Sequence, residues 1–316
     1  MKHLIHAAAL AALLVAAPVA ASADEHKAQK AVLVTGASTG IGRNITDRLA
    51  SEGYFVFAGA RKDADLAELD AIENVKAVRL DVTSQEDIDA AVETVRQGGK
   101  GLYGLINNAG VAVIGPLSQT PDSNLHFVFD VNVGGVVRVT RAFAPMIIES
   151  KGRIMTTGSI SGILSSPTLG VYSMSKHAVE AFTDSLAGEM AEHGVSVSVI
   201  EPGNYKSKIR RTTMQRTREQ LEAAGVELTE EERARFEDTA ERELALKEPD
   251  EVSDAFMHAL FSDEPKRRYM VVPNEDEADR TIRKAIEELV QLNEWQAYSF
   301  DRDELVKMLD EALTKQ

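Results

Sequence analysis

Tyr172 and Lys176 lie four residues apart in the segment Tyr-Ser-Met-Ser-Lys, and Ser159 precedes Tyr172 by thirteen residues. Residues four apart on a helix share a face, so the Lys176 ammonium can lie beside the Tyr172 hydroxyl. A free phenol has a pKa of roughly 10, and an adjacent cation favours the phenolate. Such a tyrosine could exchange a proton with an alcohol or carbonyl oxygen near neutral pH. The same spacing also occurs on ordinary exposed helices, so its meaning depends on the rest of the chain.

A glycine-rich turn follows the first apolar run after the N-terminal segment. Residues 31–34 are apolar, residues 35–42 read Thr-Gly-Ala-Ser-Thr-Gly-Ile-Gly, and an amphipathic stretch covers about 43–51. A strand, turn and helix in this order surround a diphosphate with backbone N–H groups and a helix N-terminus. The spacing is not the strict Gly-x-Gly-x-x-Gly pattern. The flanking strand and helix nevertheless favour a dinucleotide site over an ordinary loop.

Apolar runs alternate with amphipathic stretches along most of the chain. Many of their residues are β-branched and nearly all are apolar, as in strands buried on both faces. The alternation predicts βαβ units and an α/β fold with a parallel sheet. The 316 residues contain no internal repeat and no Ser/Pro-rich linker, so we expect one catalytic domain with appendages. The apolar runs are residues 31–34, 54–58, 77–80, 104–106, 153–156, 195–200 and 269–272.

The first 23 residues have the pattern of a secretory signal peptide. Lys2 and His3 precede an apolar core at residues 4–15, and Ala-Ser-Ala at 21–23 supplies a cleavage pattern. We therefore expect a periplasmic or secreted protein. An uncleaved membrane anchor is the alternative, although the core is short for a transmembrane helix. Export conflicts with nucleotide binding, because such cofactors are plentiful mainly in the cytoplasm.

The net charge of the chain and the positions of its histidines limit which macromolecules and metal ions we expect it to bind. A formal net charge of −15 argues against nucleic acid and anionic membrane surfaces, which require basic patches on the protein. No His/Cys/Asp cluster in the sequence has metal-ligand spacing, so we expect no metal. His177 and His193 are expected on helix surfaces.

Together the motifs resemble those of the short-chain dehydrogenase/reductase family. The resemblance covers roughly residues 30–272 and implies a Rossmann-like, doubly wound parallel sheet that binds NAD(P) at the strand C-termini. The segments at 249–252 and 265–272 resemble the hydroxysteroid and retinol dehydrogenase subset, which favours a hydrophobic alcohol or ketone. The motifs are Thr35-Gly36-x-x-x-Gly40-Ile41-Gly42, Asn107-Asn108-Ala109-Gly110, Asn132, Ser159, Tyr172-x-x-x-Lys176 and Pro202-Gly203, in one order with compatible gaps.

The resemblance implies hydride transfer between a nicotinamide cofactor and the CH–OH or carbonyl carbon of a small molecule. Ser159 would orient the substrate oxygen, and Tyr172 would exchange the proton. Lys176 would lower the pKa of Tyr172 and bind the nicotinamide ribose, and Asn132 would hold a water in line with Lys176. The alternative hypothesis is a catalytically silent nucleotide-binding sensor or interaction protein on the same fold, although such proteins commonly lack the residue equivalent to Tyr172 or to Lys176. The family commonly forms dimers or tetramers, which implies a homo-oligomer.

The end of the second strand favours NADP(H) over NAD(H). NAD-selective folds usually carry Asp or Glu there, whereas here Ala60 is followed by Arg61, whose guanidinium suits a 2′-phosphate. By resemblance, Asp81 and Val82 lie at the adenine, and Ser207 replaces a threonine that contacts the nicotinamide or a phosphate. The expected cofactor-binding residues are Gly36, Ser38, Thr39, Gly40, Ile41, Gly42, Arg61, Asp81, Val82, Asn108, Ala109, Gly110, Tyr172, Lys176, Pro202, Gly203 and Ser207.

We expect three segments in the chain. They are a signal peptide at 1–23, a catalytic domain at 24–272 with a substrate lid at about 204–247, and a helical extension at 273–316. The extension has the pattern of two acidic amphipathic helices with Trp295 and Tyr298 between them. The sequence leaves open whether it covers the site, joins a subunit interface or packs on the core.

Overall fold

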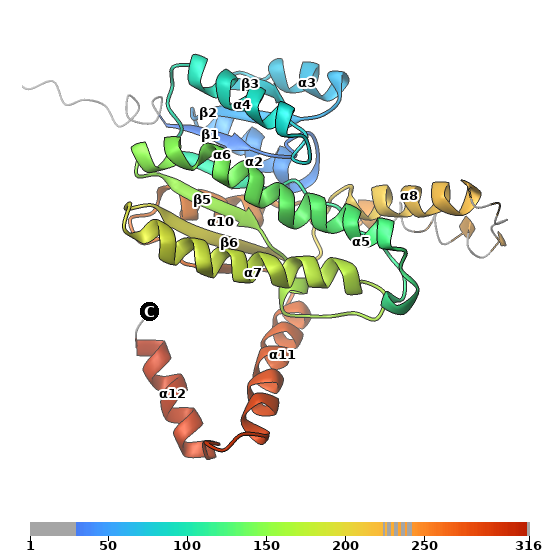
Figure 1. The fold of residues 1–316 in the computed structure, drawn as a ribbon, viewed down its shortest axis with the longest axis vertical. Helices are drawn as coiled ribbons and strands as arrows, with labels where there is room; N and C mark the ends of the chain where they lie inside the picture. Colours follow the sequence, from blue (N-terminus) through green and yellow to red (C-terminus); the bar gives the residue numbers. More distant parts are fainter. Residues whose placement is uncertain are drawn as a thin grey trace, which may run out of the picture.

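A parallel β-sheet of seven strands forms the centre of the protein (Figure 1). The computed structural model describes residues 30–223, 225, 229–230, 233–234, 238 and 242–314, and the expected signal peptide at 1–23 lies outside them. The strand order is β3-β2-β1-β4-β5-β6-β7, and every neighbouring pair is parallel. The strands are β1 (Ala31–Val34), β2 (Phe55–Ala60), β3 (Val75–Arg79), β4 (Gly104–Asn107), β5 (Arg153–Thr157), β6 (Ser196–Pro202) and β7 (Arg268–Val271).

Each apolar run in the sequence overlaps one of these strands, so the predicted doubly wound parallel sheet is confirmed. All four residues of β1 are completely buried, because helices cover both faces of the sheet. β2 lies on one side of β1 and β4 on the other. The order reverses at this point, and ligands of α/β sheets bind in the crevice that the reversal opens at the strand C-termini.

Two layers of helices enclose the sheet. One hydrophobic cluster joins α4, α6 and α7 to the sheet and includes Leu105 and Phe143. A second joins α2 and α10 to the other face and includes Ile106 and Phe256. Leu105 and Ile106 are consecutive on β4 and so point to opposite faces. The helices are α2 (Gly40–Ser51), α3 (Asp63–Asp70), α4 (Gln85–Gln97), α5 (Asp122–Phe129), α6 (Val136–Glu149), α7 (Gly170–Ala191), α8 (Ile209–Ala223), α10 (Asp250–Phe261), α11 (Glu275–Glu294) and α12 (Arg302–Thr314).

A π-helical turn, η2 (Asp130–Gly135), separates α5 from α6. The sequence pattern shows one continuous amphipathic stretch over about 123–148, and the structure divides it at this turn. Single π-turns inside helices frequently occur at functional sites. This one carries Asn132, whose amide bonds to the backbone of Val111 beside the pocket.

The expected helical extension is present as α11 and α12, and these two helices project from the sheet as a V (Figure 1). Trp295 and Tyr298 lie between them at 96% and 82% exposure. Of the expected lid at about 204–247, helix α8 accounts for Ile209–Ala223. The stretch between 224 and 241 is described only at a few residues.

Candidate active site

A cavity of about 650 Å³ lies at the C-terminal ends of the strands. Its walls come from the glycine-rich turn, from the loops that follow β2 to β6, and from α5, η2, α7 and α8. Gly42 and Asn132 are not lining residues, whereas all the other expected site residues line the cavity. Those lining residues are Gly36, Ser38, Thr39, Gly40, Ile41, Arg61, Asp81, Val82, Asn108, Ala109, Gly110, Ser159, Tyr172, Lys176, Pro202, Gly203 and Ser207.

Thr35 joins the glycine-rich turn to the loop after β4. Its hydroxyl oxygen accepts hydrogen bonds from the backbone N–H groups of Asn108 and Ala109, at 2.9 and 3.0 Å. The Asn108 side chain donates in return to the carbonyl oxygens of Thr35 and Gly36, at 3.0 and 3.2 Å. A Cβ on Gly42 would lie 2.3 Å from the Gly36 oxygen, so this position requires glycine.

The first turn of α2 suits a diphosphate. Gly36 and Gly40 have φ angles of +64° and +58°, which only glycine adopts freely. Thr39 is the N-cap residue of α2 but makes no side-chain capping bond. The first backbone N–H groups of the helix therefore have no side-chain acceptor there, which is the arrangement that binds a phosphate anion. The residues present fit a dinucleotide.

Ser159, Tyr172 and Lys176 come together from two elements. Ser159 follows β5, whereas Tyr172 and Lys176 lie on successive turns of α7. The Ser159 hydroxyl hydrogen-bonds Tyr172. The Lys176 ammonium lies over the Tyr172 ring, 5.6 Å from its centroid, and donates to the Thr157 carbonyl oxygen at 2.6 Å. The group can therefore hold a substrate oxygen between a serine and a tyrosine hydroxyl.

The pKa of Tyr172 differs from the sequence expectation. Burial raises it above the ordinary value, and the bond from Ser159 only partly opposes that rise. The expected lowering by Lys176 is therefore wrong for this structure, because the ammonium lies over the ring and is bonded to Thr157. Burial also lowers the pKa of Lys176 to about 8, against the opposing charge of Glu180. A neutral phenol is a proton donor, as the reduction of a carbonyl requires.

Asn132 is almost completely buried and ties α7 to the loop after β4. Its Oδ1 accepts from the Val111 N–H at 2.9 Å, and its Nδ2 donates to the Val111 carbonyl oxygen and the Ser175 hydroxyl at 2.9 and 3.0 Å. A Cβ placed on Gly110 would lie 3.5 Å from Asn132 Oδ1 and 4.0 Å from Lys176 Nζ. Asn132 thus lies near Lys176, and its water-holding role stays a prediction.

Arg61 and Asp81 mark the other end of the pocket. Arg61 is largely exposed, and its guanidinium lies 3.5 Å from the Asp81 carboxylate. Burial acts to raise the pKa of Asp81, but hydrogen bonds from Thr83 and the Arg61 charge outweigh it, so the pKa is lowered. Ser84 caps α4 by accepting from the Asp87 N–H, which leaves Asp81 free of a capping role as expected.

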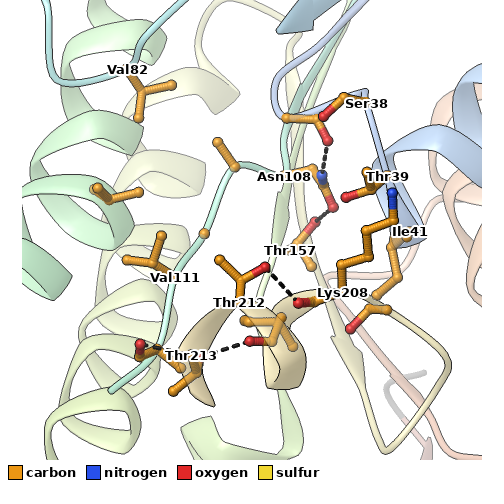
Figure 2. Close-up of a pocket in the computed structure, with 18 of the residues that line it drawn as sticks. Ser38, Thr39, Ile41, Val82, Asn108, Val111, Thr157, Lys208, Thr212 and Thr213 are labelled. Atoms are coloured by element: carbon orange, nitrogen blue, oxygen red, sulfur yellow. Dashed lines mark hydrogen bonds between the residues drawn. The ribbon is translucent and has the colours of Figure 1, made fainter. Parts of the chain in front are cut away.

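The structure adds residues that sequence reasoning missed. Lys208 extends toward Thr39 at the glycine-rich turn (Figure 2). Its position directly after the Pro-Gly turn and Ser207 is a signal that the sequence offered. Glu277, in the first turn of α11, accepts from the Asn204 backbone and side chain at 2.9 and 2.7 Å. Nothing in the sequence distinguishes Glu277 from the acidic residues beside it.

Comparison with known proteins gives one family. The family model described as short chain dehydrogenase matches residues 30–219. The mitochondrial D-beta-hydroxybutyrate dehydrogenase of Rattus norvegicus is 40% identical over 186 residues, 56% of this chain and 54% of that protein. The uncharacterized oxidoreductase YbbO of Escherichia coli (strain K12) is 35% identical over 246 residues, 77% of this chain and 86% of that protein. Retinol dehydrogenase 7 of Rattus norvegicus is 34% identical over 264 residues, 77% of this chain and 81% of that protein.

The matches cover different shares of the length of the similar proteins. The chain spans less than two thirds of the length of the hydroxybutyrate dehydrogenases that it matches, namely 54%, 57% and 61% for the proteins of rat, mouse and cattle. A solved short chain dehydrogenase/reductase from Burkholderia phymatum, in complex with NAD, has a TM-score of 0.70 and 25% identity, and covers 86% of this chain and 98% of its own. One from Burkholderia cenocepacia, in complex with NADP, has a TM-score of 0.64 and 22% identity, with coverages of 83% and 95%, and shows the shared fold.

Proposed function

The chain belongs to the short-chain dehydrogenase/reductase family, and on this premise we propose that it interconverts an alcohol and a carbonyl by hydride transfer with NADP(H). The observation that carries the proposal is the meeting of Ser159, Tyr172 and Lys176 at one pocket with an uncapped, glycine-rich helix N-terminus. The likeness to retinol dehydrogenase 7 agrees with the expected hydroxysteroid and retinol subset. The substrate is a small alcohol or carbonyl compound.

Each side chain has a distinct part in the proposed mechanism. The nicotinamide cofactor supplies or accepts the hydride when bound, and the protein supplies position and electrostatics. Ser159 holds the substrate oxygen, and Tyr172 donates its proton to that oxygen during reduction. Lys176, which donates to the Thr157 carbonyl oxygen, holds its ammonium over the Tyr172 ring and would bind the nicotinamide ribose. Asn132 connects this group to the loop after β4.

The proposed preference for NADP(H) depends on the end of β2. Ala60 offers no carboxylate to a ribose hydroxyl, and Arg61 and Lys62 line the same end of the pocket. A guanidinium can bind a phosphate by a charge-assisted, bidentate contact. The similar solved structures do not choose between the cofactors, since one is complexed with NAD and another with NADP.

Nicotinamide fluorescence titration with NADPH and NADH tests the cofactor proposal. We expect NADPH to bind at least tenfold more tightly, and Arg61→Ala to remove most of that difference. Arg96→Ala is the matched control, because Arg96 lies at the end of α4 and pairs with Glu93. Equal affinities that Arg61→Ala leaves unchanged would contradict the preference. Tight NADPH binding without reduction of any carbonyl would instead favour the silent sensor.

Export by residues 1–23 and assembly into a homo-oligomer are further parts of the proposal. Export predicts a mature chain that begins at Asp24 in the periplasmic or secreted fraction, which N-terminal mass analysis can measure. A chain that keeps residues 1–23 in the membrane fraction would favour the anchor. Light scattering of the purified chain tests the oligomer.

A further inference from the structure

Arg216 of α8 lines the pocket and has no ion-pair partner among the residues that the structure describes. The carbon at the centre of its guanidinium lies 3.6 Å from the ring centroid of Phe127, which is on α5. The Nε atom is buried and has no hydrogen-bond acceptor within the described part of the chain. A cation is thus held close over an aromatic ring, and one of its N–H donors is unused by any described residue.

The charged residues near Arg216 on α8 have ion-pair or hydrogen-bond partners. Arg218 pairs with Glu222 at 2.8 Å, and Arg211 contacts Glu243 at 3.7 Å. Glu219 lines the same pocket, but it accepts from the Gln215 side chain at 2.9 Å. In a chain with a net charge of −15, an unpaired, partly buried arginine is unusual, because buried donors and charges normally have a partner.

Other basic side chains of the pocket are available to bind the phosphates of the cofactor. Lys208 extends toward the glycine-rich turn (Figure 2), and Arg61 lies at the opposite end of the cofactor site. Arg216 follows Lys208 by eight residues, which is about 12 Å along a helix axis. It lies against the wall that α5 forms, where the side chains of Asn124 and Gln220 also join α5 to α8 at 2.8 Å.

We propose that Arg216 binds a carboxylate of the substrate, so that the enzyme acts on an oxo acid or hydroxy acid with an apolar chain. This inference rests on the proposed function for its chemistry. A guanidinium offers two parallel N–H donors to a carboxylate, and the contact with the Phe127 ring restricts where the Arg216 guanidinium lies. Phe127, Val111 and Val131 line the same cavity and provide apolar contact for the chain.

A binding experiment tests this inference without turnover. Butyrate, octanoate and dodecanoate are titrated calorimetrically against the full chain, each beside its primary amide, with and without NADPH. We expect at least one carboxylate to bind tenfold or more tightly than its amide, and Arg216→Gln to abolish the difference. Arg216→Lys, which keeps the charge but not the fork, should retain part of it. Arg218→Gln is the control on the same helix, and unfolding midpoints of all variants confirm folding.

The contrary outcomes are distinct. Equal binding of acid and amide, or no binding of either to the wild-type chain, would overturn the inference. A loss of NADPH affinity in Arg216→Gln, with the acid–amide difference kept, would overturn it as well and would assign Arg216 to a cofactor phosphate. A wild-type chain that prefers the carboxylate but reduces no oxo acid would leave the Arg216 site standing and would contradict the proposed function instead.

Discussion

The Lys176 ammonium donates a hydrogen bond to the carbonyl oxygen of Thr157, with 2.6 Å between the two atoms. Thr157 is the last residue of β5, and Lys176 lies on α7, so the bond fixes the helix against the sheet beside Tyr172. Burial lowers the pKa of Lys176 to about 8. The proposed active site therefore contains a cation whose charge changes with pH close to the physiological range.

Lys176→Met should stabilise the fold at neutral pH while it reduces activity. The pKa of Lys176 is lower in the folded than in the unfolded chain, so its contribution to stability is complete above about pH 10.5 and is lost as pH falls through about 8. Removal of the amine should raise the unfolding free energy by up to about 3 kcal/mol at pH 7. Urea unfolding at neutral and alkaline pH measures the difference between variant and wild type, and a difference independent of pH would contradict the buried cation.

Glu201 should make the fold less stable as pH rises. Burial and the neighbouring Glu180 raise its pKa to about 8, although Arg268 lies 3.8 Å away and opposes the rise. A raised folded pKa gives a contribution that is complete below about pH 4.5 and is lost as pH rises through about 8. Glu201→Gln should flatten this decline in urea unfolding, whereas the exposed Glu189→Gln on α7 should leave it unchanged. A wild-type stability that stays constant over this window would be inconsistent with a protonated Glu201.

Gly42→Ala should weaken cofactor binding and stability together. The new Cβ would lie 2.3 Å from both the Gly36 oxygen and the Asn108 side chain, so the turn must open. Gly188→Ala on α7 is the matched control, since its Cβ meets nothing within 4 Å. Alanine there should be neutral or stabilise by roughly 0.5–1 kcal/mol. NADPH titration and thermal unfolding of both variants measure the contrast, and equal behaviour would refute the tight packing.

Glu277→Ala should reduce activity although Glu277 lies outside the expected catalytic domain. It accepts two bonds from Asn204, next to Gly203 in the pocket wall, and its loss should cost about 1–3 kcal/mol of unfolding free energy. Asp279→Ala removes an exposed charge from the same helix and should change neither quantity. Steady-state kinetics and urea unfolding compare the two. Full activity of Glu277→Ala would show that the first turn of α11 does not support the site.

The sheet could be predicted from the sequence because its strands are buried on both faces. A run such as 31–34 has no polar position, because both of its faces are buried. It can therefore be recognised as a strand without knowledge of the neighbouring strands. The glycine-rich turn could also be predicted, since Gly36, Gly40 and Gly42 are each required by the local backbone conformation or by a close backbone contact.

Other features depend on distant contacts and could not be predicted. Glu277 meets Asn204 across 73 residues, and Arg216 meets Phe127 from another helix. The expected lowering of the Tyr172 pKa was wrong for a related reason. Helical spacing places Lys176 on the correct face, but it does not reveal that the ammonium is bonded to Thr157 and that the phenol is buried.

The most direct measurement is NADPH oxidation by the wild-type chain and by Tyr172→Phe, over a panel of ketones, aldehydes and oxo acids. We predict that the wild type reduces at least one carbonyl. Tyr172→Phe should reduce it roughly 10²–10⁴-fold more slowly, because the proton donor is gone. The NADPH affinity measured by fluorescence should stay the same. Equal rates for the two proteins, or bound NADPH with no reduction anywhere in the panel, would contradict a tyrosine-dependent oxidoreductase.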